Sequence, residues 1–167
     1  MIFAALLFVQ PPMDDPLAPM RFLSGRCWRG QFGSSAAYDV MCAEDMPGGH
    51  IRARHLVRGI DGDYRGETIY FHDAERQLIR FHYYTSLGAI QQGVVTVDGD
   101  RFQIYPIRHV RADGTVLQLS ATGERTEEGS YRTTTRFWGA GKWGDASVVT
   151  MQSIDCANWA AVEAGCD

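Results

Sequence analysis

The stretch that decides the fold is CWRGQFGSSAAYDVMC, residues 27–42, in which two cysteines stand at equal distances from a Gly-Ser-Ser turn. A turn centred between Ser34 and Ser35 places Cys27 directly opposite Cys42 on two antiparallel strands. Opposed residues on such strands bring their Cβ atoms close enough for a disulfide. The stretch therefore predicts a β-hairpin closed by a Cys27–Cys42 bridge, unless a bulge or a slip of one residue separates the thiols.

The chain has four cysteines, so Cys156 and Cys166 form the remaining pair if the hairpin is bridged. Four cysteines allow three connectivities, and a bridge from the tail to the first hairpin stays open at this point. Buried free thiols are the other alternative, because unpaired cysteine is well tolerated in a protein core.

The same hairpin pattern continues along the chain. Short runs of β-branched and aromatic residues alternate with turn signals such as Asp98-Gly99 and Asp113-Gly114, a dipeptide typical of tight hairpin turns. The expected strands are 25–33, 36–45, 50–58, 66–72, 77–85, 89–97, 101–110, 115–122, 130–138 and 146–153. Only the tail CANWAAVEAG, residues 156–165, has helical character.

These features predict an all-β chain in which about ten antiparallel strands follow one another up and down. A long meander removes its exposed edges by closing into a barrel. A β-sandwich is the alternative, but it needs longer crossover connections than this sequence offers. We therefore expect a single up-and-down β-barrel of about ten strands, with a short C-terminal helix.

The domain plan follows from length and from the N-terminal composition. A chain of 167 residues is ordinarily one domain, which we place at residues 21–167. Residues 1–20 are interpreted as a signal-like or disordered segment, because the apolar run 2–9 is too short to span a bilayer and is followed by two prolines. The segment lacks a basic residue before this run and a clear cleavage site, so packing on the domain is the alternative. The N-terminal apolar segment and the even number of cysteines together predict a periplasmic or secreted protein. A cytoplasmic location is the alternative.

Charge and motifs exclude several classes of function. The net charge is −4 and the pI about 5.7, without the basic footprint of an electrostatic nucleic-acid binder. The five histidines have no metal-ligand spacing, and Cys-x-x-Cys, phosphate-loop and dinucleotide motifs are missing from the sequence. We therefore expect no metal and no cofactor.

Strand periodicity sorts the side chains of 66–72 and 77–85 onto two faces. Thr68, Tyr70, Phe81 and Tyr83 share the face expected to line the interior. The turn at 73–76 places Glu67 opposite His82 on the other face. Such a pair is an acid–base dyad in some enzymes, but an exposed cross-strand ion pair is the favoured interpretation.

The later strands contribute Phe102, Tyr131 and Phe137 to the same interior. Arg108 falls in this register as well, and inside an apolar barrel its guanidinium needs an anionic partner such as a ligand carboxylate. The favoured interpretation is that Pro106 introduces a bulge and turns Arg108 outward. The predicted ligand-contacting residues are Trp28, Thr68, Tyr70, Phe81, Tyr83, Phe102, Arg108, Tyr131 and Phe137.

The segment FLSGRCWRGQF, residues 22–32, resembles the Gly-x-Trp-x-Gly opening strand of the lipocalin-like (calycin) barrels. The resemblance implies that Trp28 caps the closed end of the barrel. YDVMCAEDMPGGHIRARHLV (38–57), YRGETIYFHD (64–73) and FHYYTSLGAIQQG (81–93) are similar to an uncharacterised bacterial family of small lipocalin-like proteins. That family has no assigned reaction, so the resemblance implies a fold and no activity.

The related nitrobindins open with a similar Trp-x-Gly and bind haem through a histidine near the C-terminus. This chain has no histidine after His109, so the axial ligand of that family is missing. His55 or His82 would have to replace it, and haem is not expected.

The sequence thus predicts non-enzymatic binding of a small hydrophobic or amphipathic molecule inside the barrel. One alternative is an enzyme of the cyclase or isomerase type that uses Tyr70, Tyr83 or His82 as proton donors. Another is a barrel filled by its own side chains that acts only through its surface. A buried tyrosine or histidine with a charged neighbour inside the cavity favours the enzyme.

Overall fold

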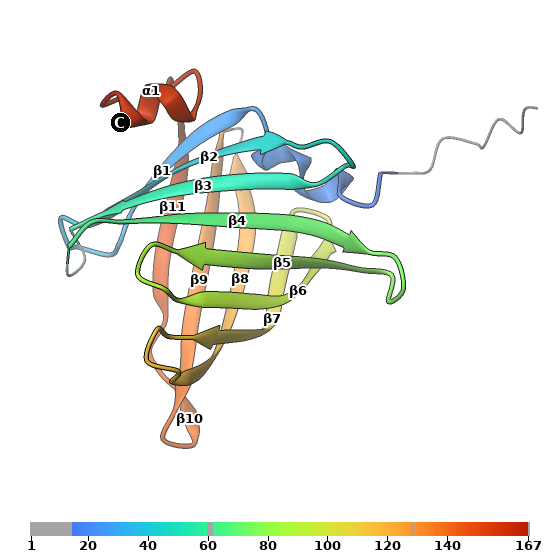
Figure 1. Ribbon diagram of the computed structural model, residues 1–167, viewed down its shortest axis with the longest axis vertical. Coiled ribbons are helices and arrows are strands. Elements are labelled where there is room, and N and C mark those ends of the chain that lie inside the picture. Colours follow the sequence, from blue (N-terminus) through green and yellow to red (C-terminus); the bar gives the residue numbers. More distant parts are fainter. Residues whose placement is uncertain (1–14, 60–61, 128, 167) are drawn as a thin grey trace, which may run out of the picture.

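The computed structural model describes residues 15–59, 62–127 and 129–166 (Figure 1). The elements in chain order are η1 (Ala18–Leu23), β1 (Arg26–Gln31), β2 (Tyr38–Asp45), β3 (Ile51–Arg58), β4 (Tyr64–Asp73), β5 (Leu78–Thr85), β6 (Ile90–Asp98), β7 (Arg101–Val110), β8 (Val116–Glu127), β9 (Ser130–Gly139), β10 (Lys142–Trp143), β11 (Ser147–Ile154) and α1 (Trp159–Glu163). The strands follow the hairpin pattern of the sequence closely.

Ten of the strands form a closed antiparallel barrel. Strands β1 to β9 pair in chain order, and β11 completes the ring by pairing with both β9 and β1. The short β10 pairs with β9 alone and forms the hairpin that projects from the barrel in Figure 1. The predicted all-β, up-and-down barrel with a short C-terminal helix is confirmed, and the sandwich is excluded.

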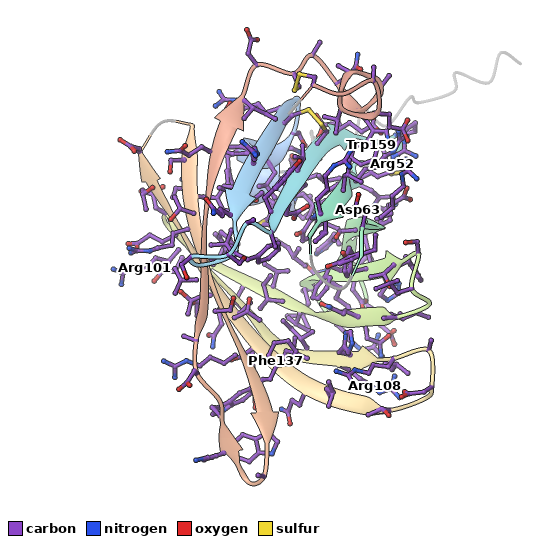
Figure 2. The ribbon with its side chains drawn as sticks, turned by 90° about the vertical axis from the view of Figure 1, so that its left-hand side faces the viewer. Arg52, Asp63, Arg101, Arg108, Phe137 and Trp159 are labelled. Atoms are coloured by element: carbon purple, nitrogen blue, oxygen red, sulfur yellow. A yellow bond between two sulfur atoms is a disulfide. The ribbon has the colours of Figure 1, made fainter. Side chains whose placement is uncertain are left out.

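Both predicted disulfides are present. Cys27 lies opposite Cys42 in the β1–β2 ladder and is bonded to it, while Cys156 is bonded to Cys166. Figure 2 shows both bridges in yellow near α1. The four cysteines pack with Val40, Leu56 and Val162 in a second hydrophobic cluster on the outer face of the barrel. One bridge therefore links the two strands of the first hairpin, and the other links the two sides of the C-terminal helix. Both lie where this helix packs on the outer face of the barrel.

One end of the barrel is plugged by η1, and we call it the closed end. Leu17, Met20 and Leu23 are buried there in the main core. Trp28 is 2% exposed, and its indole Nε1 donates a hydrogen bond of 3.1 Å to the Leu23 carbonyl. The expected domain boundary at residue 21 therefore falls inside an element that packs on the barrel. The first 14 residues, most of the expected signal segment, lie outside the described residues.

The opposite end carries the connections β1–β2, β3–β4, β5–β6, β7–β8 and β9–β11, and we call it the mouth. In Figure 1 these connections lie at the left and at the bottom, away from η1 at the upper right. Since alternate residues of each strand face inward, the mouth half of the interior is lined by the ends of β1, β3, β5, β7 and β9 and by the beginnings of the other strands.

Two register expectations are corrected. The β7–β8 ladder shifts between Ile104 and Ile107, so both isoleucines face inward and Arg108 is exposed on the outer wall, opposite Gln118 (Figure 2). Pro106 has no N–H for the ladder, which accounts for a bulge at this position. In the β4–β5 ladder Glu67 lies opposite Tyr84, not His82; a shift of two residues leaves the assignment of faces intact.

Candidate functional site in the barrel cavity

The barrel encloses a cavity of about 350 Å³ above the closed end. Its walls come from β2 to β9 and from β11, and its floor includes Met20 and Leu23 from the plugged end. Phe137 lines this cavity and yet is 48% exposed, on the part of β9 next to the projecting hairpin (Figure 2). The cavity therefore reaches solvent at the mouth.

Most of the cavity wall is apolar. It is formed by side chains that strand alternation directs inward from both halves of the barrel. Those in the main core or packed against it are Met41, Phe81, Phe102, Ile104, Ile107, Leu119, Val149 and Met151. No polar or charged ligand group finds a partner among these side chains.

One side of the wall carries a group of polar side chains, which we call the polar cluster: Asp39, His55, Tyr64, Thr68 and Tyr83. The cluster spans four neighbouring strands, β2 to β5. His55 Nδ1 lies 2.9 Å from Asp39 Oδ2, and His55 Nε2 lies 3.3 Å from Thr68 Oγ1. The side chains of His55 and Asp39 are each 15% exposed. The imidazole is therefore held from both of its nitrogens.

The strand register explains how the cluster is assembled. In the β2–β3 ladder Met41 lies opposite His55 and Asp39 opposite Val57, so Asp39 and His55 are diagonal neighbours on the inner face. His55 also lies opposite Gly66 of β4. A Cβ atom at Gly66 would come within 2.3 Å of the Tyr83 hydroxyl, so the missing side chain provides the space in which Tyr83 lies beside His55.

Hydrogen-bond roles within the cluster follow from the chemistry of the groups. An ionised Asp39 can only accept, so His55 Nδ1 carries the proton and Nε2 carries a lone pair. The Thr68 hydroxyl then donates to Nε2. Asp39 Oδ1 is buried and has no hydrogen-bond partner in the described part of the chain. The carboxylate thus stands in the cavity wall with only one of its oxygens satisfied.

The tyrosines of the cavity are kept protonated. Burial raises the pKa of Tyr70 to about 12. Burial also raises the pKa of Tyr83, and the neighbouring Tyr64 and Asp39 raise it further. The pKa of Tyr131 is raised well above its ordinary value, again mainly by burial. For Tyr64 burial is the main cause of a raised pKa, partly offset by a hydrogen bond with Tyr83. These hydroxyls remain neutral and available as donors at physiological pH.

The structure brings most of the sequence-predicted site residues together. The cavity is lined by Thr68, Tyr70, Phe81, Tyr83, Phe102, Tyr131 and Phe137. Trp28 lies below it, packed edge-on against Tyr131 at a centroid distance of 4.9 Å. Arg108 is exposed on the outer wall, so the expectation that it faces the interior was wrong.

Sequence reasoning missed Asp39, His55 and Tyr64 as site residues, although the signal was present. Asp39 alternates with Met41, which pairs with Trp28 across the first hairpin and shares its inner face. His55 alternates with the buried Ala53 and Val57 in the next strand. Extending the face assignment to these two strands would have placed a carboxylate and an imidazole inside the barrel.

No protein-family model matches the chain, and no curated protein matches it in sequence. Within the described ranges, no helix is long and apolar enough to cross a bilayer. A search of the same ranges finds no group of three or more His, Cys, Asp or Glu side chains placed to hold a metal ion.

Proposed function

We propose that this protein binds a small amphipathic molecule inside its barrel. The observation that carries the proposal is that one cavity combines a largely apolar wall with the polar cluster on β2 to β5. A hydrophobic body fits against the apolar side chains, while one polar end reaches the polar cluster. The volume of about 350 Å³ is in the range of sites for small organic ligands.

The polar cluster defines what the polar end of the ligand offers. Asp39 Oδ1 lacks a partner, and the tyrosine hydroxyls are donors as well as acceptors. A ligand hydroxyl can therefore donate to Asp39 Oδ1, and a ligand carbonyl can accept from a tyrosine hydroxyl. A ligand carboxylate would be repelled by the negative charge of Asp39, and the described lining residues include no arginine to offset this repulsion. This supports a neutral or cationic polar end, in contrast to the acid expected when Arg108 was placed inside.

We infer a lipocalin-like relationship of the calycin type, distantly similar to the nitrobindins. The inference is supported by the closed barrel, by the plug at one end and by Trp28 buried under it. We also infer a periplasmic or secreted location. Two disulfides support it, because such bonds persist in oxidising compartments.

A displacement titration tests the proposal. The oxidised protein is titrated with the neutral dye N-phenyl-1-naphthylamine, and the bound dye is displaced by decanol, decylamine and decanoate at equal concentrations. We expect saturable dye binding, with decanol and decylamine displacing the dye at lower concentrations than decanoate. If no dye binds with saturation and none of the three alters its fluorescence, the binding function is refuted.

A further inference from the structure

We propose that the polar cluster is a proton-transfer site, in which His55 removes a proton from the carbon next to a carbonyl group of the bound molecule. The inference rests on the proposed function, since the substrate has to enter the same cavity. It adds a reaction class and a substrate class, namely the isomerisation of a small amphipathic ketone or aldehyde.

The first support is the way in which His55 is held. Asp39 Oδ2 accepts the Nδ1 proton at 2.9 Å, which fixes the tautomer and favours the imidazolium formed during catalysis. Nε2 then carries the basic lone pair, and its contact with Thr68 Oγ1 is long, at 3.3 Å. A hydroxyl at this distance is readily displaced by a substrate. In this arrangement His55 is the base and Asp39 a positioning residue.

The second support is the pair of tyrosines beside the imidazole. The His55 and Tyr83 rings pack edge-on at a centroid distance of 5.3 Å. Tyr83 and Tyr64 share a hydrogen bond. The hydroxyls of Tyr83 and Tyr64 have one proton each, and the hydrogen bond between them uses one of these protons. The other proton can be donated to an oxygen atom of the ligand. A neutral phenol in a partly desolvated wall is a good donor to a developing oxyanion.

The third support is the composition of the remaining wall. The described lining residues include no arginine, lysine or glutamate, and Asp39 and His55 are the one charged or chargeable pair besides the tyrosines. Among these residue types, histidine is the base suited to neutral pH. The apolar surroundings strengthen electrostatic interactions with a developing charge.

The reaction balances without a cofactor. The Nε2 lone pair takes the proton, the C–H electron pair forms a carbon–carbon double bond, and the carbonyl π pair moves to oxygen. Tyr83 or Tyr64 donates a hydrogen bond to the resulting enolate. In a substrate with a double bond between its β and γ carbons this enolate is a dienolate. The oxygen pair then re-forms the carbonyl, the double bond moves to the α and β carbons, and the γ carbon takes the proton from the imidazolium, which regenerates His55 and releases the α,β-unsaturated isomer.

A chromogenic probe tests the base without knowledge of the natural substrate. A base that removes the C3 proton of 5-nitrobenzisoxazole breaks its N–O bond and releases the coloured 2-cyano-4-nitrophenolate. We expect saturation kinetics, with a kcat/KM at least about 100-fold above the rate constant of free imidazole at the same pH. The dye that occupies the barrel should inhibit the reaction competitively.

Three variants assign the activity. His55→Gln should lower kcat/KM at least about 100-fold, while the control His82→Gln, on the outer face of β5, should leave it unchanged. Asp39→Asn should lower kcat and leave KM nearly unchanged, because an amide does not stabilise the imidazolium that forms only as the proton is transferred. A merely structural role of Asp39 would raise KM and weaken dye binding as well. Far-UV circular dichroism verifies the fold of each variant.

The outcomes separate this proposal from the binding function. If the probe displaces the dye but reacts no faster than with free imidazole, or equally fast in His55→Gln, the proton-transfer site is refuted and binding stands. If the dye binds but the probe fails to displace it, the proposal is contradicted as well, because a reactive cavity must admit a molecule of this size. If the dye itself does not bind, both proposals fail.

Discussion

The two ends of the barrel are built from the same strands but differ in what fills them. At the closed end Leu17, which precedes η1, is buried together with Met20 and Leu23 of η1, and Phe22 packs against Trp28 and Tyr131. At the mouth none of the described residues forms such an element, and polar side chains line part of the space that remains. We therefore expect the closed end to supply stability, whereas the proposed ligand chemistry belongs to the mouth half.

Exposed hydrophobic side chains show the same asymmetry. Every large apolar residue with high exposure in the described chain belongs to the mouth half or the middle of its strand, or to a mouth connection: Tyr84, Leu87, Ile90, Tyr105, Val116, Phe137, Trp138 and Val148. The closed end has none of them. Two tryptophans represent the contrast, since Trp28 is 2% exposed and Trp138 is 41% exposed.

The largest effect is expected from this tryptophan pair. Trp28→Ala should lower the free energy of unfolding by about 3–5 kcal/mol, because it removes a buried aromatic ring and leaves a cavity under η1. Trp138→Ala, the matched control, should cost less than about 1 kcal/mol. Urea unfolding followed by circular dichroism measures both. Equal losses would mean that the closed end is not the stabilising part of the barrel.

The disulfides come next. Replacing Cys27 and Cys42 together by alanine should lower the free energy of unfolding by about 3 kcal/mol, because the bridge constrains a 15-residue separation in the unfolded chain. The Cys156/Cys166 double variant, with a separation of 10, should lose a few tenths of a kcal/mol less on the same argument. Urea unfolding of oxidised proteins compares the two. No loss in either variant would contradict the bridging of the first hairpin and of the tail.

Unfolding at alkaline pH provides a third test, because it depends on the buried tyrosines that line the cavity. The folded pKa of Tyr70, about 12, lies above the ordinary value of 10, so its contribution to stability is complete below pH 10 and is lost as the pH rises toward 12. Each such buried tyrosine lowers the free energy of unfolding by about 1.4 kcal/mol per pH unit in this window. Absorbance at 295 nm should show these phenols ionising only together with unfolding. Ionisation of every tyrosine near pH 10 in the folded protein would contradict their burial.

The smallest effect on stability is expected in the polar cluster. Gly66→Ala should lower the free energy of unfolding by only about 1 kcal/mol, because the group it displaces is the mobile end of Tyr83. The same change should weaken dye binding several-fold, since Tyr83 is pushed into the cavity. Gly139→Ala, whose added Cβ meets nothing within 4 Å, is the control. Unchanged dye affinity in Gly66→Ala would place the binding site elsewhere.

The sequence predicts the hairpins well because turn residues and alternation are local properties. Cys27 and Cys42 could be paired by counting from one turn, and inward residues such as Phe81 follow from a period of two. Arg108 faces outward because the bulge at Pro106 reverses that parity; the proline indicates the bulge in the sequence, whereas alternation alone does not. The contact between Asp39 and His55 depends on the register of β2 and β3. It can be predicted only when the inward-facing residues of both strands have been assigned.

Other parts of the fold could not be predicted from local patterns. The docking of η1 against the barrel depends on tertiary contacts of Leu17 and Met20, whose short segment carries no periodicity. The cavity volume depends on how side chains of different strands fill the interior, for example Met151 and Val149 of β11 over Gly30 of the neighbouring β1. Strand prediction determines which residues face inward, but it leaves open how much space they enclose.

The central claim is that the empty interior near the mouth is the binding site, and one pair of neighbouring variants tests it most directly. Thr135 lines the cavity, whereas Thr134 on the same strand faces outward. The dissociation constant of N-phenyl-1-naphthylamine is measured for Thr135→Phe and Thr134→Phe by fluorescence titration. We expect Thr135→Phe to weaken binding at least about tenfold, which corresponds to about 1.4 kcal/mol, and Thr134→Phe to leave it within twofold of the parent. Equal affinities in the two variants would show that the dye binds outside the barrel and would contradict the account.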